Sequence, residues 1–378
     1  MPSEPKDNTA SHVLHRRTGV LPYTVLSGEG IYLNLNSGRR IIDGSGGAAV
    51  ACLGHGRKDI ADAIQRQLSS FAYAYSGANL TSHPAEELAR LLLEDTYGEG
   101  SKAFFCNSGS EATEAALKLA LQFWREKGCE TRTQIVARRQ GYHGNTLSAL
   151  SVSGIDDRRK DYSSWMSPHV TFVERCFPYR GKATSESDQD YVRRLVEDLD
   201  NTFQRIGPQN IAAFIMETVS GTSLGCVPPP RGYLKEIAAV CKKHGIILIL
   251  DEVRTFVGSR SSLFPSMIDT IQIMCGMGRI GALHAWQLED FDGPDIQTIG
   301  KSLGGGFIPL SAVLVSRKVI EAVSLGSGRF SHSHTFQVSG SRLTVHNPTA
   351  KRYELKGPSA GMCCSSCRTG SSGIRKSD

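Results

Sequence analysis

Residues 246 to 252 read IILILDE, a run of five apolar residues followed by two acids. A segment that is apolar on both faces is typical of a central strand in a parallel sheet, because helices cover both sides of such a sheet. On either side of this run, short apolar segments alternate with helical patterns, which predicts an α/β fold with crossover helices. The other predicted strands are 103–106, 134–137, 169–173 and 211–216, and the predicted helices are 107–128 and 231–244.

Length and composition describe an ordinary globular protein. The 378 residues are enough for two domains, or for one large domain with a smaller satellite. No apolar run approaches the ~20 residues of a membrane helix. The first residues have no apolar core for a signal peptide, and their early acids argue against a transit peptide. The sequence therefore predicts a cytoplasmic protein without a membrane partner.

The formal net charge of +6 is concentrated at the carboxyl end. Residues 338–378 have seven basic residues against two acids, so the rest of the chain is close to neutral and predicts no nucleic-acid partner. The ten cysteines are scattered, as the reduced thiols of a cytosolic protein are. Their one cluster, Cys363, Cys364 and Cys367, has no second ligand pair nearby, so no metal site is predicted.

Three predicted strand ends have residues suited to ligand binding, and open α/β sheets bind ligands at the carboxyl ends of their strands. The first end leads into Ser108, Gly109 and Ser110 at the start of a predicted helix. Exposed N–H groups, the helix dipole and hydroxyl groups would bind a phosphate there. The alternative is an ordinary helix cap.

The second and third strand ends offer a carboxylate and an aromatic ring. Asp251 follows the apolar run, where burying a carboxylate is costly unless a cation such as a protonated ring nitrogen compensates it. The alternative is an Asp that caps the next segment. Tyr142 and His143 stand between two glycines, where a ring could stack on a flat cofactor. A tight turn with two surface aromatics is the alternative.

Lys301 lies in the stretch DIQTIGKSLGGGF, residues 295–307, just past a short apolar run and before three glycines. A lysine in this position can present its amine to a carbonyl group of a ligand. The amine becomes a nucleophile when desolvation or a nearby cation favours its neutral form. Taken alone, the same pattern also describes a surface lysine at a flexible turn.

In this order, these pieces resemble the class III (ω-amino-acid type) aminotransferases, which depend on pyridoxal phosphate and have fold type I. The resemblance implies a large domain with a mostly parallel central sheet and flanking helices, and a small domain that is incomplete in this chain. It runs from about residue 18 to residue 337, over the stretches NSGSEATEAALKLA, GYHGNTLSALSVSG, AFIMETVSG, VPPPRGYLKEI, IILILDEV, CGMGRIG, IGKSLGGGFIPLSAVLVS and HSHTFQ.

The resemblance implies pyridoxal 5'-phosphate as the cofactor and a role for each matched residue. Lys301 would form the internal Schiff base and move the proton, and Asp251 would keep the pyridinium nitrogen protonated. Thr335 would reach the phosphate in the partner subunit, which implies a homodimer. The other implied cofactor-binding residues are Ser108, Gly109 and Ser110 at the phosphate, Tyr142 stacked on the ring, and Glu217 nearby.

The resemblance implies an enzyme that transfers an amino group from an amine or ω-amino acid to a keto acid such as pyruvate. Decarboxylating, racemising and mutase relatives share the cofactor residues, so those reactions stay open. A further alternative is a catalytically inactive, truncated protein of the same fold. A remote one is an NAD-dependent dehydrogenase, because Gly276, Gly278 and Gly281 satisfy G-x-G-x-x-G. The expected acid about twenty residues onward is missing there.

Two segments depart from the family pattern. Residues 254–273 separate DEV from MCGMGR, which are contiguous in relatives, and we interpret them as an insertion from a retained intron or a gene-model error. Residues 338–378 are basic, rich in Ser and Gly and without sustained periodicity, which predicts a disordered tail. The predicted domains are an N-terminal part of the small domain, 1–55, a large cofactor-binding domain, 56–337, and this tail.

Overall fold

The structure, a computed structural model, describes residues 11–94, 96–221, 223–253 and 282–343. The predicted insertion 254–273 lies outside these ranges, as do the G-x-G-x-x-G glycines and the cysteine cluster. The predicted tail lies outside them from residue 344 onward.

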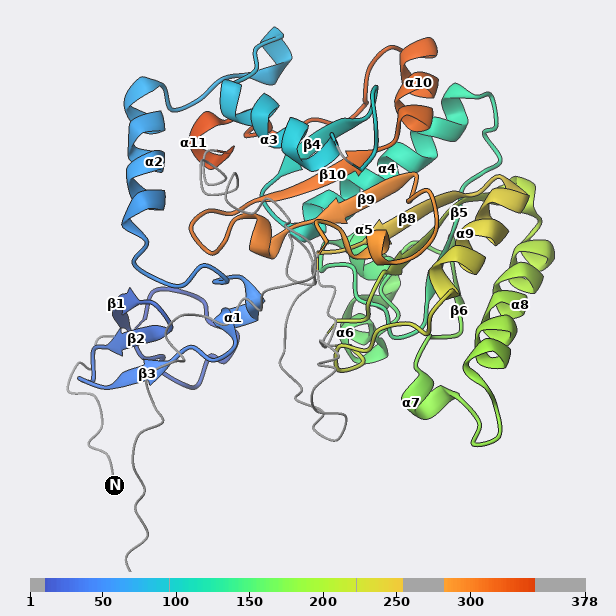
Figure 1. Ribbon diagram of the computed structural model, residues 1–378, viewed down its shortest axis with the longest axis horizontal. Helices are drawn as coiled ribbons and strands as arrows, with labels where there is room; N and C mark the ends of the chain where they lie inside the picture. Colours follow the sequence, from blue (N-terminus) through green and yellow to red (C-terminus); the bar gives the residue numbers. More distant parts are fainter. Residues whose placement is uncertain (1–10, 95, 222, 254–281, 344–378) are drawn as a thin grey trace, which may run out of the picture. The chain divides into compact units, whose positions relative to one another are not determined.

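A seven-stranded sheet forms the centre of the described chain, in the order β4-β10-β9-β8-β7-β5-β6 (Figure 1). Strands β9, β8, β7, β5 and β6 pair in parallel, while β10 pairs antiparallel with both β9 and β4. The predicted α/β fold with a mostly parallel sheet is therefore confirmed. The strands are β4 (Lys102–Cys106), β5 (Gln134–Arg138), β6 (Val170–Val173), β7 (Ile211–Glu217), β8 (Ile247–Asp251), β9 (Ile296–Ile299) and β10 (Ser311–Val315).

Strand β8 lies at the middle of this sheet because its side chains are apolar in both directions. Ile247 and Ile249 pack into a buried cluster with helix α4, while Leu248 and Leu250 pack into a second cluster with helices α8 and α9. Every residue of β8 and of its neighbour β7 is buried. The apolar run that predicts a central strand is thus covered on both faces, as a parallel sheet requires.

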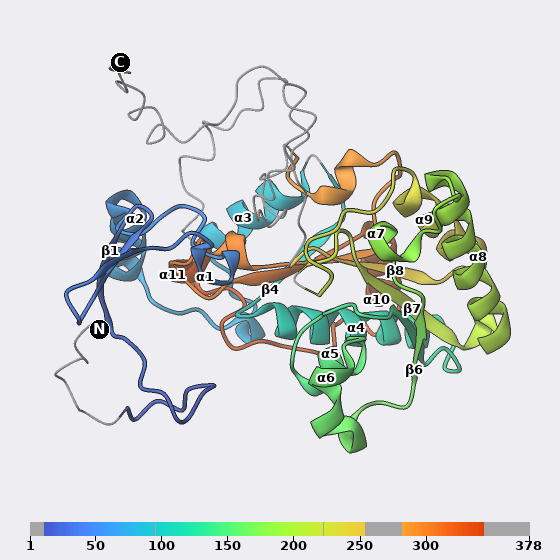
Figure 2. The ribbon, with the colours of Figure 1, turned by 90° about the horizontal axis from the view of Figure 1, so that it is seen from below.

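Helices cover both faces of the sheet; in Figure 2, α4 and α5 lie below it and α3 and α9 above it. One face has α4 (Gly109–Glu126), α5 (Leu147–Ser151) and α10 (Arg317–Leu325), and the other has α3 (His83–Leu93), α8 (Asp188–Ile206) and α9 (Tyr233–His244). Within the described ranges, no helix is both long and apolar enough to cross a lipid bilayer.

The remaining elements are short, apart from α2. They are α1 (Gly46–Ala49), α2 (Lys58–Ser70), α6 (Asp156–Arg159), α7 (Pro178–Gly181), and the 3-10 turns η1 (Ser76–Ala78), η2 (Lys160–Trp165), η3 (Pro208–Asn210), η4 (Ala285–Leu288) and η5 (Lys301–Leu303).

A second, three-stranded antiparallel sheet lies near the amino terminus, within the predicted segment 1–55. Its strands are β1 (Val25–Glu29), β2 (Tyr32–Leu35) and β3 (Arg40–Ile42). Most of its residues are exposed or half-buried, and Leu35 is the one buried residue of the three strands. The assignment of this segment to a small domain stays a prediction.

The packed chain continues beyond Gln337, after which the sequence predicts a tail. Val338 and Leu343 are buried in a cluster with α3, β4 and β10. Leu343 closes the short helix α11 (Gly340–Leu343), which contacts α2 and α3. The residues from 338 to 343 are therefore part of the folded core.

Candidate functional site

The predicted site residues gather at one edge of the large sheet, where several strands end. Glu217, the last residue of β7, pairs with Asp251, the last residue of β8, and Asp251 pairs with Thr298 of β9. Lys301 follows β9 after a single glycine. The turn with Tyr142 follows β5, and α4 begins shortly after β4. The sheet topology thus brings together residues that are up to about 200 positions apart in sequence.

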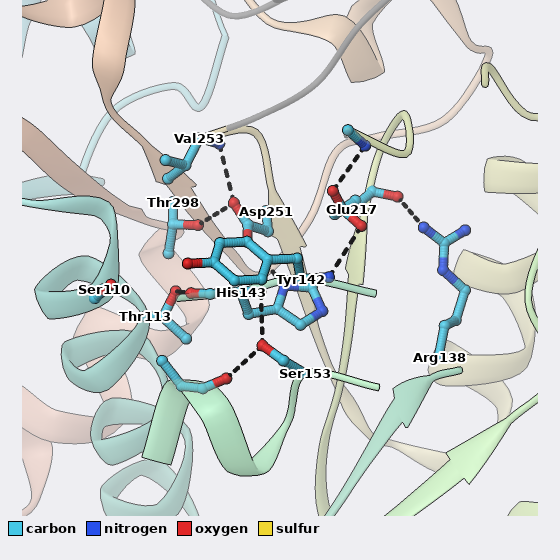
Figure 3. Close-up of polar contacts among 12 residues, drawn as sticks. Ser110, Thr113, Arg138, Tyr142, His143, Ser153, Glu217, Asp251, Val253 and Thr298 are labelled. Carbon is cyan, nitrogen blue, oxygen red and sulfur yellow. Dashed lines mark hydrogen bonds and ion pairs between the residues drawn. The ribbon is translucent and has the colours of Figure 1, made fainter. Parts of the chain in front are cut away.

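Asp251 is buried and held by several hydrogen-bond donors (Figure 3). Its Oδ2 atom lies 2.8 Å from Nδ1 of His143. Its Oδ1 atom accepts from the backbone N of Val253 at 2.9 Å and from Oγ1 of Thr298 at 3.1 Å. These donors offset the cost of burying a carboxylate. A carboxylate fixed in this way can support a positive charge on a ligand at the end of β8.

His143 belongs to the site, so the alternative of a turn with two surface aromatics is wrong for this residue. Its side chain is buried, its backbone N donates to Oγ of Ser153 at 2.8 Å, and its backbone O accepts from Oγ1 of Thr113 at 2.8 Å. These bonds fix the ring so that Nδ1–H donates to Asp251. Nε2 is also buried and has no hydrogen-bond partner among the described residues.

Glu217 holds the backbone of the Tyr142 turn. Its side chain is 1% exposed, and its Oε2 atom accepts from the backbone N of Tyr142 at 3.2 Å. Its Oε1 atom accepts from the backbone N of Gly221 at 2.8 Å. Burial raises the pKa of the Glu217 carboxyl above its ordinary value, because the charged form loses its hydration. Tyr142 itself is half-buried, and the guanidinium of Arg158 lies 4.5 Å from its ring centroid.

The start of α4 is a capped helix end that also fits an anion. Ser108 and Glu111 form a capping box, in which the Ser108 Oγ atom accepts from the Glu111 backbone N at 3.3 Å. The alternative of an ordinary helix cap is therefore confirmed, with Ser108 as the cap. Ser110 instead accepts at Oγ from the backbone N of Asn145 at 3.1 Å. The first N–H groups of α4 carry the positive end of the helix dipole.

Two glycines keep this helix end close to its neighbours. A Cβ atom on Gly109 would lie 2.4 Å from Cγ1 of Val253, just past the end of β8. A Cβ atom on Gly144, whose φ is +137°, would lie 2.6 Å from Oγ of Ser110. Only glycine permits these approaches, which place the start of α4 beside both the end of β8 and the Tyr142 turn.

Lys301 opens the turn η5 in a left-handed backbone conformation, with φ at +49°. For a residue with a side chain this conformation costs about 1–2 kcal/mol, so the surrounding packing must impose it. The following loop is tightly packed, because a Cβ atom on Gly304 would lie 2.2 Å from the Ile308 carbonyl oxygen. The half-buried lysine is therefore held by its loop and is not the flexible surface residue of the alternative reading.

Thr335 is exposed, and the residue before it contacts the start of α4. The neighbouring His334 places its Nε2 atom 3.3 Å from Nδ2 of Asn107 and 3.6 Å from Oε2 of Glu111. The segment is thus anchored next to the helix end expected to bind phosphate. The role of Thr335 in a partner subunit stays a prediction.

Together these residues fit a flat cofactor that has a phosphate and a basic ring, as pyridoxal 5'-phosphate does. The start of α4 offers N–H groups at the positive end of its helix dipole, and the glycines at 109 and 144 let it lie against Val253 and the Tyr142 turn. Asp251 offers a buried carboxylate at the end of β8. Lys301 offers an amine just past the end of β9, which is hydrogen-bonded to β8.

A family model described as aminotransferase class-III matches residues 13–272 and 267–351. An uncharacterized aminotransferase of Schizosaccharomyces pombe is 41% identical over 335 residues, which cover 89% of this chain and 68% of the relative. An uncharacterized aminotransferase of Bacillus subtilis is 35% identical over 88% of this chain and 70% of its own length. A gamma aminobutyrate transaminase of Solanum lycopersicum is 30% identical over 89% of this chain and 61% of its own length.

Solved structures show the same likeness. A thermostable (S)-enantioselective omega-transaminase from Thermomicrobium roseum matches with a TM-score of 0.78 at 32% identity, covering 89% of this chain and 70% of that protein. The chain thus spans between 61 and 70% of the length of these relatives.

Proposed function

Because the chain belongs to the class III aminotransferase family, we propose that it is a pyridoxal 5'-phosphate-dependent transaminase. Its donor would be an amine or ω-amino acid, and its acceptor a keto acid such as pyruvate. The observation that carries this proposal is the buried Asp251 carboxylate on β8, hydrogen-bonded to His143, beside the strand that leads to Lys301. Relatives described as gamma aminobutyrate transaminase and omega-transaminase support the substrate class.

The bound cofactor would supply an aldehyde that accepts the amino group and a ring that withdraws electrons. The Asp251 carboxylate would stabilise a proton on the ring nitrogen, and His143 keeps that carboxylate in place. The Lys301 Nζ atom would take a proton from the substrate carbon and then return a proton to complete the transfer. The start of α4, with Gly109 and Ser110, would bind the phosphate, and the Tyr142 ring would pack against the cofactor ring.

We further propose a cytoplasmic homodimer in which Thr335 contributes to the phosphate site of the partner. The exposed position of Thr335, next to the start of α4, supports this arrangement. Equilibrium sedimentation of the chain with and without pyridoxal 5'-phosphate tests the dimer.

The function is tested by trapping the cofactor on the protein. Full-length chain is mixed with pyridoxal 5'-phosphate, reduced with borohydride, digested and mapped by mass spectrometry. We expect the reduced adduct on Lys301, and none in Lys301→Ala. An adduct of equal yield on another lysine in that variant contradicts the assignment.

A second measurement separates transamination from the inactive alternative. Pyruvate consumption is followed with an ω-amino acid or an amine as donor. An adduct at Lys301 together with pyruvate-dependent amino transfer supports the proposed reaction. The same adduct without any transfer supports the catalytically inactive protein.

A further inference from the structure

A buried polar cluster lies next to the site residues and belongs to none of the roles described above. It consists of Tyr97, Glu252, His284, Trp286 and Gln297, which we name the Gln297 cluster. Glu252 follows Asp251 directly, and Gln297 precedes Thr298 on β9. Apart from the half-buried Tyr97, the side chains are buried, with Glu252 at 1% and Gln297 at 0% exposure.

Glu252 ties the end of β8 to the start of η4. Its Oε2 atom accepts from the backbone N of Ala285 at 2.8 Å, and its Oε1 atom accepts from the backbone N of Trp286 at 3.0 Å. Its own backbone N donates to the carbonyl oxygen of Thr298 on β9 at 2.8 Å. One residue therefore joins three parts of the chain, directly beside Asp251.

Gln297 ties β9 to the same segment through its side-chain amide. Its Oε1 atom accepts from the hydroxyl of Tyr97 at 2.8 Å and from Nε1 of Trp286 at 3.1 Å. Its Nε2 atom donates to Nδ1 of His284 at 3.1 Å. Both ends of the amide are thus engaged, which fixes its orientation and leaves little freedom for the backbone of β9 at this point.

His284 completes the connection by reaching the end of α3. Because a carbonyl oxygen can only accept, Nε2–H of His284 donates to the Leu92 carbonyl at 3.2 Å, and Nδ1 is left as the acceptor for Gln297. The histidine is neutral in this arrangement, in keeping with its burial, which lowers its pKa to about 4. The cluster is linked to Asp251 and Lys301 through the backbones of β8 and β9, because Glu252 directly follows Asp251 and Gln297 lies on the strand that leads to Lys301.

We propose that the Gln297 cluster positions the two catalytic residues, Asp251 and Lys301. The catalytic part of this proposal rests on the proposed transaminase function. Glu252 holds the end of β8 at Asp251. Gln297 holds β9 directly before Thr298, which bonds Asp251, and shortly before the strand end that leads to Lys301. Both tethers end on the same short segment around Trp286. The distance between the ring-nitrogen carboxylate and the lysine amine is therefore set by this cluster.

The test is a graded series of variants in the full chain. Tyr97→Phe removes one hydrogen bond. Glu252→Gln also removes one, because the new amide NH2 cannot accept from a backbone N–H. Gln297→Leu removes three while it keeps a side chain of similar size. Gln204→Leu on the exposed face of α8 is the matched control, since it makes the same change away from the cluster.

The first readout needs no cofactor. Hydrogen exchange is measured by mass spectrometry on peptides that cover the ends of β8 and β9, with β4 and β6 as internal references. We expect exchange at residues 250–253 and 298–301 to rise by about tenfold in Gln297→Leu, less in Glu252→Gln and least in Tyr97→Phe, with the references unchanged. Equal exchange in all variants and in the control overturns the proposal. If Gln297→Leu fails to fold, the comparison of Glu252→Gln and Tyr97→Phe with the control still tests it.

The second readout distinguishes positioning from a merely structural role. In protein that carries the cofactor on Lys301 without reduction, the pH midpoint of the visible absorbance band reports the surroundings of the lysine and of Asp251. We expect a shift of about one pH unit in Glu252→Gln and Gln297→Leu, and none in Gln204→Leu. Local exchange changes with an unmoved midpoint mean that the cluster only stabilises the fold, and this overturns the positioning role. Wild-type protein that forms no Lys301 adduct counts against the proposed function, while the exchange series still tests whether the cluster holds the two strand ends.

Discussion

The two sheets of this chain are built from similar residues and differ in their cover. In the large sheet, every residue of β7, β8, β9 and β10 is buried. In the small amino-terminal sheet, Leu26 is 68% exposed and Ile42 is 61% exposed. The large sheet has helices on both faces, and the predicted site residues other than Thr335 lie at the strand ends of this sheet or follow them. Apolar strands therefore define a site only where other elements cover them and fix their ends.

The largest effect is expected at Asp251, at the carboxyl edge of the large sheet. Asp251→Asn keeps the shape of the side chain but removes the charge that would stabilise a protonated ring nitrogen. We expect transaminase turnover to fall on the order of 1,000-fold, while phosphate-anchored cofactor still binds. Steady-state kinetics and cofactor titration measure the two effects separately.

Asp43 offers a matched control, because it is an acid that follows the small sheet and bonds His55 at 3.2 Å. Asp43→Asn should leave turnover within about threefold of the wild type, given that surface-sheet changes are usually small. Near-normal turnover in Asp251→Asn, or equal losses in both variants, would falsify the ring-nitrogen role.

A substitution in the core of the large sheet should have the next largest effect, on the free energy of unfolding. Phe214 of β7 is 0% exposed and packs between the sheet and α8. Phe214→Ala should lower the free energy of unfolding by about 3–5 kcal/mol, because it removes buried apolar contacts and leaves a cavity. Urea unfolding monitored by circular dichroism measures the loss. A loss below about 1 kcal/mol would mean that the sheet centre is far less tightly packed than its burial indicates.

The pH dependence of stability should also come from the large sheet, because two ionisable groups with opposite pKa shifts are buried beside it. Burial raises the pKa of Glu252 from 4.5 to about 7 and lowers that of His284 from 6.5 to about 4. The raised acid pKa stabilises the fold below pH 4.5, and this contribution is lost as the pH rises through 7. The lowered histidine pKa stabilises the fold above pH 6.5, and this contribution is lost as the pH falls through 4.

Between pH 4.5 and 6.5 these two contributions oppose each other, so removing one should expose the other. In Glu252→Gln, the free energy of unfolding relative to wild type should fall by about 3 kcal/mol as the pH drops from 7 to 4.5. In His284→Gln, the free energy of unfolding relative to wild type should instead rise as the pH drops over the same range. Urea unfolding across this range measures both, with Glu29→Gln on the exposed strand β1 as the control. A flat difference in both variants would show that neither group is buried as described.

The smallest effect is expected on the small sheet itself. Leu26→Ser removes an exposed apolar side chain, so the free energy of unfolding should change by less than about 0.5 kcal/mol. Exposed apolar side chains also favour association, so the same variant should shift the chain toward smaller species in size-exclusion chromatography. A loss of stability comparable to that of Phe214→Ala would indicate that another part of the chain covers this sheet.

Much of the large sheet could be predicted, because buried strands are visible as apolar runs. The predicted strand 134–137 differs from β5 by one residue, and 211–216 differs from β7 by one. The antiparallel β10 was not predicted, although SAVLV is equally apolar, since strand direction depends on partners that are distant in sequence. The strands β1 to β3 are short and exposed, so they give no clear alternation of apolar and polar residues.

The site residues could be located from sequence only where a motif accompanies them. Asp251 and Lys301 stand at the ends of apolar runs, and Gly109 stands at a recognisable helix start. His143 could be suspected from its place between glycines, but its bond to Asp251 joins residues 108 positions apart. Glu252 and Gln297 carry no local signal, because an acid after a strand and an amide within one read as solvent-facing residues.

Local sequence was thus sufficient for the strands, the helix starts and the chemical character of each strand end, since these depend on the order of apolar and polar residues along the chain. Tertiary structure alone decided which strand ends became neighbours, that His143 and Thr298 hold Asp251, and that Gln297 is buried. The physical reason is that burial and hydrogen-bond geometry are properties of residues brought together from distant positions. Gln297 acquires its three partners only after the turn that follows α3 and the start of η4 have packed against β9.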